Sequence, residues 1–303
     1  MILVYGTICI DRVFVLRELP KPGGYAEIVS QTSVLGGEAA NTAAFLHAWG
    51  RDVRLAGNPT GDGAEGELLA AMIREKGLPD ALIRRGNGPV PVCYILVTGD
   101  GERTMFGQGF GDFGREGLVD GVPFAAGNWF TADPNMSRAS REAVRRAIDA
   151  GMAIYLMDFI RPDDPIEAGS YWQSSTDWLG RRGDVQHNVE FVKELVDRRH
   201  CHAILSDGPN GLVAGSPAHP VRHFPPFPCP RVVDSTGAGD AFRAGMLYGL
   251  DRGWDFGSCL RFASAAGCLK CQSLGATSRI PTVAEIEAHI GANPEVADRY
   301  ALS

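Results

Sequence analysis

One stretch of the chain, residues 234–242, has the residue types and spacing for phosphoryl transfer: Asp-Ser-Thr-Gly-Ala-Gly-Asp-Ala-Phe. The stretch leads into residues 241–250, whose apolar side chains recur at helical spacing, so we predict a glycine turn followed by a helix. The small residues of the turn are Gly237, Ala238 and Gly239. They leave backbone N–H groups bare at a helix N-terminus, and such an end attracts anions.

Asp240 lies just inside this predicted helix end. A carboxylate is a poor ligand for a phosphate, so we interpret Asp240 as the general base that removes a proton from an attacking hydroxyl. The N–H groups of the turn would then hold the charge that develops on the phosphate. The alternative is that Asp240 is an acid that complements the helix dipole and that the glycines only make a turn.

Two other phosphate-binding motifs do not occur in the sequence. No lysine follows a glycine, so the chain lacks the GxxxxGK[ST] pattern of a P-loop. The dinucleotide pattern GxGxxG is not completed either, because Phe242 stands at its last position.

The composition fits a large globular protein with an ample core: 303 residues, 45% hydrophobic and 21% charged. The net charge of −7 and the absence of a basic run predict no nucleic-acid or membrane partner. Seven cysteines, an odd number spread along the chain, indicate reduced thiols. No signal peptide or membrane span is evident, so we expect a cytoplasmic protein.

Predicted strands and helices alternate along most of the chain, which is typical of an α/β fold with a doubly wound, mostly parallel sheet flanked by helices. We expect a single domain over 1–303. Residues 12–35 and about 90–111, the second with a Gly-Asp-Gly hairpin signal, are predicted to form a small separate β-sheet. Residues 163–184 are predicted to be an irregular loop.

Several polar residues and glycines follow predicted strands or begin predicted helices. In a doubly wound sheet, ligands bind beyond the carboxyl ends of the strands, so these positions should share one rim. They are Asp11, Gly36, Gly37, Asp158, Asn188, Ser206 and 234–240.

These motifs resemble the ribokinase-like, or PfkB, carbohydrate kinases over nearly the whole chain. Residues 36–41, Gly-Gly-Glu-Ala-Ala-Asn, resemble the first family signature, GGxxxN, and residues 234–240 resemble the second, DTxGAGD, with Ser235 in place of threonine. Two signatures in the right order are more specific than either alone. The hairpin that ends at Arg103 is similar to that of the fructokinase-like branch.

The resemblance implies an ATP-dependent kinase for a sugar hydroxyl, whose small sheet is a lid over the substrate and can be shared in a homodimer. Asp240 would be the base, with Gly237–Asp240 as the anion hole. The substrate would be bound by Asp11, Gly36, Gly37 and Asn41, together with Arg103. The nucleotide would lie against Ser206, Gly208, Gly211 and Ser264.

The resemblance also implies two metal ions, Mg²⁺ with ATP and K⁺ beneath the anion hole. The K⁺ ligands would be Asp234 and carbonyl groups near Lys270, Ser273 and Gly275. For Mg²⁺ the family uses Asn-x-x-Glu. In this sequence Asn188 is present, but the acid, Glu190, comes one residue early, so either Glu190 substitutes or ATP phosphates and water hold the ion.

The sequence leaves the substrate open. Arg161 is a candidate for an acidic sugar, and Glu38 stands where ribokinases have lysine. A nucleoside kinase of the same fold is the nearer alternative, because aromatic lid residues such as Phe14 and Tyr94 could stack on a base. A non-catalytic sensor of sugars or nucleotides is the other, since a fold does not fix a function.

Overall fold

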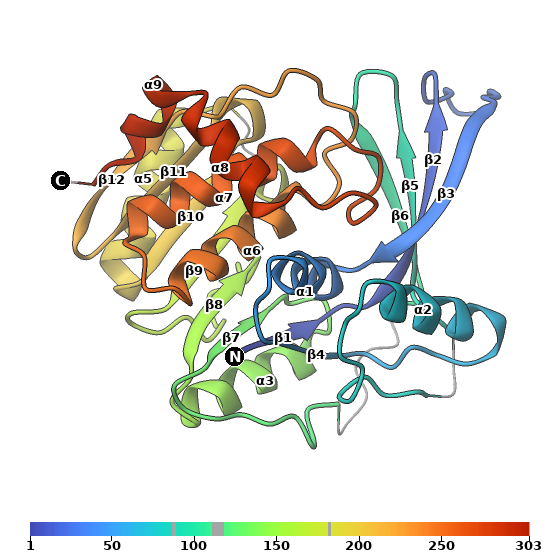
Figure 1. Ribbon diagram of the computed structural model, residues 1–303, viewed down its shortest axis with the longest axis horizontal. Coiled ribbons are helices and arrows are strands. Elements are labelled where there is room, and N and C mark those ends of the chain that lie inside the picture. The colour runs from blue at the N-terminus through green and yellow to red at the C-terminus, as the bar shows by residue number, and fades with distance from the viewer. Residues whose placement is uncertain (87–88, 111–117, 181–182, 303) are drawn as a thin grey trace.

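Strands and helices alternate around one large sheet (Figure 1). The structure is a computed structural model that describes residues 1–86, 89–110, 118–180 and 183–302. Within these residues the large sheet has the strand order β12 (His219–Phe224), β11 (Leu212–Ser216), β10 (His202–Ser206), β9 (Tyr171–Ser175), β8 (Ala153–Met157), β7 (Trp129–Ala132), β1 (Ile2–Gly6) and β4 (Val53–Gly57). Neighbours from β4 to β10 are parallel, whereas β11 pairs antiparallel with both β10 and β12, which confirms the predicted fold class.

Helices cover both faces of this sheet (Figure 1). They are α1 (Glu38–Ala48), α2 (Gly63–Glu75), α3 (Arg138–Asp149), α4 (Thr176–Leu179), α5 (Val185–Arg199), α6 (Ala238–Leu250), α7 (Phe256–Lys270), α8 (Val283–Gly291) and α9 (Pro294–Ala297), with 3₁₀ turns η2 (Gly208–Asn210) and η3 (Asp298–Tyr300). None of the helices in the described part of the chain has the length and apolar character to cross a membrane.

Strand β1 shows why the sheet needs two helical layers. All five of its residues are buried, as expected for a parallel strand that is covered on both faces. Ile2 and Val4 belong to the core that contains α1, α6 and α7, whereas Leu3 and Tyr5 belong to the core that contains α3 and α5. Successive side chains of a strand point to opposite faces, so one short apolar run supports both layers.

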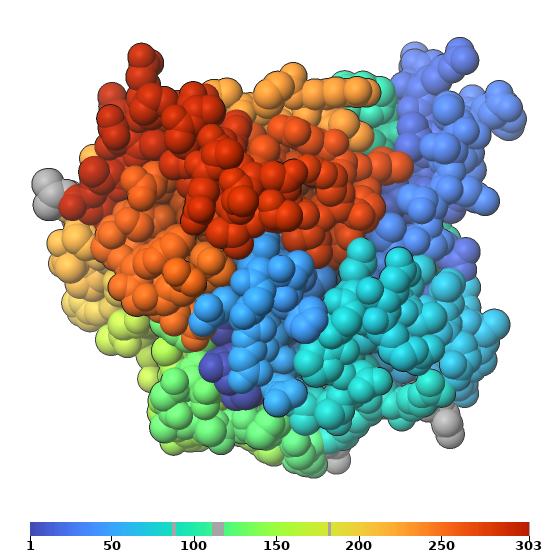
Figure 2. All heavy atoms as spheres, in the orientation of Figure 1, coloured from blue at the N-terminus to red at the C-terminus, as the bar shows by residue number. Residues whose placement is uncertain are grey.

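A second, four-stranded sheet stands at one side of the body (Figures 1 and 2). Its order is β3 (Ile28–Gly36), β2 (Cys9–Leu16), β5 (Val92–Val97) and β6 (Arg103–Gln108). Strands β5 and β6 lie within the segment predicted over about 90–111, of which residue 111 lies outside the described residues. Strand β2 begins at Cys9 and β3 ends at Gly36, so both extend past the predicted bounds of 12–35. Several large apolar side chains on its edge strands are exposed: Ile28, Val29, Met105 and Phe106.

The prediction of an irregular loop over residues 163–184 was wrong. The segment contains β9, which lies between β8 and β10 in the large sheet, and the short helix α4. The run Tyr-Trp-Gln-Ser-Ser is short and polar, so it lacks the apolar pattern that identifies a buried strand. Two of its polar residues, Gln173 and Ser174, are nevertheless buried and form hydrogen bonds.

The parallel strands end at one rim, and acidic residues follow two of them directly. Asp133 comes after β7 and Asp158 after β8. Gly6, the last residue of β1, faces Asp133 so closely that a Cβ atom there would lie 1.9 Å from a carboxylate oxygen. At this rim a carboxylate therefore lies directly against the backbone of a glycine, at the edge of the sheet where ligands bind in such folds.

Candidate active site

The glycine turn before α6 has the predicted geometry. Gly237 is the N-cap residue and has φ 81°, a left-handed conformation that favours glycine. A Cβ atom on Gly237 would lie 2.7 Å from Cβ of Ala276, so a side chain is excluded by contact as well. The N–H of Ala241 is bonded to the carbonyl of Gly237 at 2.9 Å, which leaves the N–H groups of Gly239 and Asp240 in the open first turn.

Asp240 is buried at this helix end, with one carboxylate oxygen hydrogen-bonded and the other held only by an ion pair. Asn41 of α1 donates from Nδ2 to Oδ2 of Asp240 at 2.9 Å, and Nη2 of Arg243 lies 3.6 Å from Oδ1. Among the described residues Oδ1 has no hydrogen-bond partner. Burial raises the pKa of Asp240 to about 6, although Arg243 and the bond from Asn41 oppose the shift.

Asp11 is a second buried carboxylate, held against bare backbone. It lies in β2 and is 4% exposed. A Cβ atom on Gly36 would stand 2.0 Å from Oδ1 of Asp11, so glycine is required at that position. A Cβ atom on Gly37, the N-cap of α1 with φ 94°, would lie 2.3 Å from the carbonyl oxygen of Thr7. Burial raises the pKa of Asp11 to about 7.

Further charged residues surround Asp240, and of these only Asp158 was predicted from the sequence to share its rim. Arg243 is fully buried and bonds Oγ1 of Thr42 at 2.8 Å and the carbonyl of Glu38. Burial raises the pKa of Glu38 well above its usual range, and the charges of Asp133, Asp158 and Asp240 add to the shift. Asp133 could have been found from its position directly after a predicted strand, and Arg243 from its spacing of three residues from Asp240 on one helix.

The residues predicted to bind the nucleotide lie beyond β9 and β10 and on the adjoining helices. Ser206 ends β10, Gly208 begins the turn η2 and Gly211 follows it, and both glycines have positive φ. Asn188 of α5 is 1% exposed, and its Oδ1 has no partner among the described residues. Ser264 of α7 accepts a hydrogen bond from the hydroxyl of Tyr300 at 2.9 Å.

Comparison with known proteins identifies the family. The family model described as "pfkB family carbohydrate kinase" matches residues 1–110 and 133–283. The chain belongs to the pfkB family of carbohydrate kinases. An uncharacterized sugar kinase of Dictyostelium discoideum is 29% identical over 346 aligned residues, which cover 96% of this chain and 98% of that protein.

Solved structures share the fold of this pfkB kinase. Ribokinase of Arabidopsis thaliana, complexed with ribose and ATP, superposes with a TM-score of 0.75 at 20% identity, over 95% of this chain and 98% of that one. A nucleoside kinase of Burkholderia thailandensis in complex with inosine gives a TM-score of 0.74 at 22% identity, over 96% and 97%. At such identities the likeness establishes the ribokinase-like fold and leaves the substrate of this kinase open.

The structure does not bring Glu190 to the nucleotide side of this kinase. Helix α5 is regular from Val185, so no local shift turns Glu190 toward Asn188. Two residues along a helix are about 200° apart, which puts the buried Asn188 and the exposed Glu190 on opposite faces. Glu190 accepts a hydrogen bond from Gln186 instead, at 2.9 Å.

The two arginines predicted to bind substrate have different surroundings. Arg103 of β6 donates from Nη1 to the hydroxyl of Ser235, so it joins the small sheet to the second signature. Arg161 has an exposed side chain, and its backbone N–H is bonded to Oδ2 of Asp164 at 2.8 Å. The structure therefore brings Arg103 to the signature and leaves Arg161 at the surface.

The residues expected to hold K⁺ surround a side-chain amino group. Nζ of Lys270 donates to the carbonyl of Asp234 at 2.9 Å and to that of Ser273 at 3.0 Å. The carboxylate of Asp234 accepts from Thr236 through Oδ1 and from the N–H of Gly275 through Oδ2. Burial lowers the pKa of Lys270, and Asp234 opposes that shift. These oxygens do not fit a metal ion as they stand, because the amino group already occupies the space between them.

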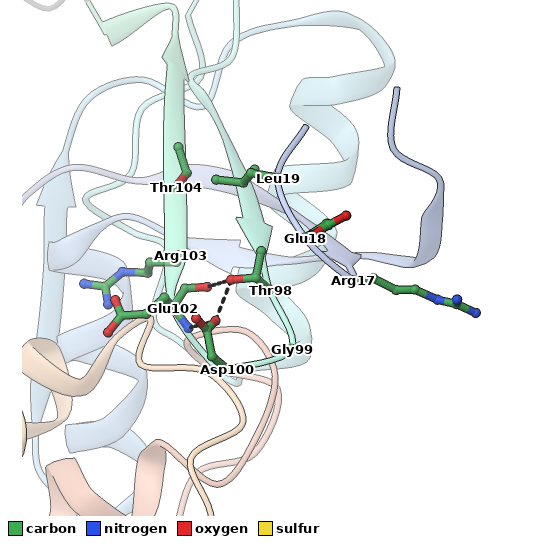
Figure 3. A pocket seen from close by; sticks show the side chains of 9 residues that line it. All are labelled: Arg17, Glu18, Leu19, Thr98, Gly99, Asp100, Glu102, Arg103 and Thr104. Atoms are coloured by element: carbon green, nitrogen blue, oxygen red, sulfur yellow. Dashed lines mark hydrogen bonds between the residues drawn. The ribbon is translucent and has the colours of Figure 1, made fainter. Parts of the chain in front are cut away.

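A cavity of about 480 Å³ opens on the small sheet, between residues 17–19 and the hairpin of β5 and β6 (Figure 3). In the hairpin Thr98 donates from its hydroxyl to Oδ1 of Asp100 at 2.7 Å. Arg103 lines this cavity and also donates a hydrogen bond to Ser235. Asp11 and Asp240 do not line it, so we place the chemistry at the rim of the large sheet.

Proposed function

We propose that this kinase transfers the terminal phosphoryl group of ATP to a hydroxyl of a neutral, sugar-like molecule, with Asp240 as the general base. The observation that carries the proposal is Oδ1 of Asp240, which accepts no hydrogen bond among the described residues and is buried at the first turn of α6. A base must reach the proton it removes, and a phosphoryl group needs donors where its charge develops. The first turn of α6 supplies both the base and the N–H donors.

In the proposed reaction, Asn41 and Arg243 hold the Asp240 carboxylate while Oδ1 takes the proton of the attacking hydroxyl. The N–H groups of Gly239 and Asp240 bind the transferring phosphate oxygens at the positive end of the α6 dipole, since the N–H of Ala238 is bonded to the carbonyl of Ser235 at 3.1 Å. Mg²⁺ bound to ATP would neutralise phosphate charge, and the open Oδ1 of the buried Asn188 fits a contact to its water shell.

We propose that the substrate is rich in hydroxyl groups and carries no negative charge. Asp11 and Asn41 offer buried acceptors for vicinal hydroxyls, and Oδ1 of Asn41 has no partner among the described residues. Asp133 and Asp158 add negative potential around Asp240. A sugar acid would be repelled there, and Arg161 lies exposed rather than in the site.

The small sheet would be the lid that excludes water, with Arg103 as its contact to the signature. A homodimer through its exposed edge residues stays a prediction. So does the nucleoside kinase alternative, for which the stacked rings of Phe14 and Tyr94, with centroids 6.4 Å apart, are the candidate base platform.

The deciding experiment measures ADP release from Mg·ATP with a panel of hexoses, pentoses, sugar acids and nucleosides, using Asp240→Asn as the control. Turnover with a neutral sugar that the variant lacks would support the proposal. Turnover with nucleosides alone would replace it by the nucleoside kinase. Binding of a panel member without turnover would support the sensor, and preference for a sugar acid would contradict the electrostatic argument.

We expect kcat/KM to fall as the pH drops below about 7. Asp240 accepts a proton only when it is ionised, and burial raises its pKa to about 6. Asp11, whose pKa burial raises to about 7, loses its charge over the same range. Ordinary aspartates would keep their charge down to about pH 4. Initial rates from about pH 5 to 9 test this, and a profile that stays level to pH 5 would contradict the role of Asp240.

A further inference from the structure

The amino group of Lys270 is buried in the protein interior. The side chain is fully buried, which is rare for lysine unless it is paired. It extends from the last residue of α7 and donates to the carbonyl groups of Asp234 and Ser273, at 2.9 and 3.0 Å. It takes no part in the mechanism described above, so its burial and its two hydrogen bonds require a separate explanation.

The two carbonyl groups belong to the segments that support the anion hole. Asp234 opens the turn that ends at Gly237, and Ser273 precedes the segment that contains Gly275 and Ala276. The N–H of Gly275 donates to Oδ2 of Asp234 at 2.7 Å, and Ala276 packs directly against Gly237. The amino group thus ties together the two backbone segments on which the first turn of α6 rests.

Carbonyl and carboxylate oxygens are also the ligands that hard cations take. A potassium ion between the carbonyl oxygens of Asp234 and Ser273 would occupy the position of Nζ of Lys270. An ammonium group is a compact charge with three donors, so it can replace such an ion. The positive charge then comes from the chain itself and is present before any ligand binds.

We propose that Lys270 is a positioning residue whose amino group replaces the monovalent cation beneath the anion hole, so that this kinase works without K⁺. The inference rests on the proposed function in one respect, that residues 237–240 bind the transferring phosphate. Lys270 touches neither substrate nor phosphate; it fixes the backbone that does. Losing it should therefore lower kcat more than it raises the KM for the sugar.

The first arm of the test needs no variant. The turnover of the wild-type kinase is measured in tetramethylammonium buffer and again with K⁺ at matched ionic strength. We expect the two rates to agree within about twofold, because the site is already filled. Activation by K⁺ of about fivefold or more would overturn the proposal.

The second arm uses Lys270→Met, which keeps the length of the side chain and removes the charge. We expect kcat to fall about 10²-fold in tetramethylammonium buffer, a loss of the size seen when an anion-hole donor is removed. Added K⁺ or NH₄⁺ should restore part of it, since a cation can enter the vacated space. A variant with normal kcat, or one that no cation restores, would contradict the proposal.

The third arm does not depend on catalysis. The Tm of ligand-free Lys270→Met should rise with K⁺ while that of the wild type does not, because only the variant has a place for the ion. Lys76→Met is the matched control, since Nζ of Lys76 also donates to a backbone carbonyl of this region, that of Thr277, at 2.6 Å. Its Tm should fall without any response to K⁺. If no substrate were ever turned over, this arm would still decide the role of Lys270: an equal K⁺ response in both variants would refute it.

Discussion

Asp240→Asn is expected to lower kcat by roughly 10³-fold, within the range that general-base catalysis contributes. The amide is nearly isosteric with the carboxylate and can still accept the bond that Asn41 donates at 2.9 Å. It cannot take a proton from the attacking hydroxyl. ATP should bind with nearly unchanged affinity, because the nucleotide residues near β10 and η2 are untouched. Steady-state kinetics and ATP titration of the same preparation measure both quantities.

Asp251→Asn is the matched control for this variant. Asp251 follows the other end of α6 and pairs with Arg51, so its loss tests the helix without touching the site. We expect its kcat to stay near that of the wild type. Stability separates a catalytic defect from a folding defect: burial disfavours the charged form of Asp240, so Asp240→Asn should melt no lower than the wild type at pH 8. An unchanged kcat in Asp240→Asn would refute the assignment of the base.

Local pattern was sufficient to predict the elements that carry the signatures. The glycines at 36, 37 and 237 were predicted from their types and positions, and each proves to lie where a Cβ atom would collide with a carboxylate, a carbonyl or another side chain. The alternation of apolar runs predicted the parallel sheet. Strand β9 was not predicted because two of its three buried residues, Gln173 and Ser174, are polar. Gln173 on that strand donates to the carbonyl of Gly239 at 3.0 Å, so the missed strand also supports the anion hole.

The sequence did not predict contacts that depend on where a side chain ends in the folded protein. Glu190 was one residue from the expected position, and only the regular helix shows that this offset turns it to the opposite face. The role of Lys270 depends on where a long side chain ends, 36 residues away in sequence from the carbonyl that it binds. Such long-range bonds leave no local periodicity. The carboxylate cluster around Arg243 was missed for the same reason, since Glu38, Asp133 and Asp240 lie far apart in the chain.

Asp11→Asn is expected to weaken substrate binding and to stabilise the protein. The amide has one acceptor oxygen where the carboxylate has two, so the substrate loses charge-assisted hydrogen bonds. We expect the KM for the sugar to rise by about 10- to 100-fold, the equivalent of roughly 1.5–3 kcal/mol for a bond to a charged group. The KM for ATP should change little, since Asp11 lies on β2 of the small sheet, away from the nucleotide residues.

The gain in stability should depend on pH in a defined direction. Burial raises the pKa of Asp11 from 3.8 to about 7 in the folded protein, so the folded state disfavours the charged form. Below about pH 4 the carboxyl is protonated in both states and its burial carries no such penalty. As the pH rises toward 7 the penalty grows, to an upper bound of about 4 kcal/mol at about 1.4 kcal/mol per pKa unit. The difference in Tm between Asp11→Asn and wild type should therefore be small at about pH 4 and widen by pH 8.

The two measurements on Asp11→Asn distinguish a substrate-binding carboxylate from a structural one. A structural carboxylate would stabilise the fold, and its replacement would lower Tm at every pH. A carboxylate that is kept buried at a cost to stability implies selection for binding instead. Gly36, whose missing Cβ atom leaves room for Oδ1 of Asp11, fits that second case. A lower Tm at pH 8 together with an unchanged sugar KM would show that Asp11 serves the fold and would remove it from the site.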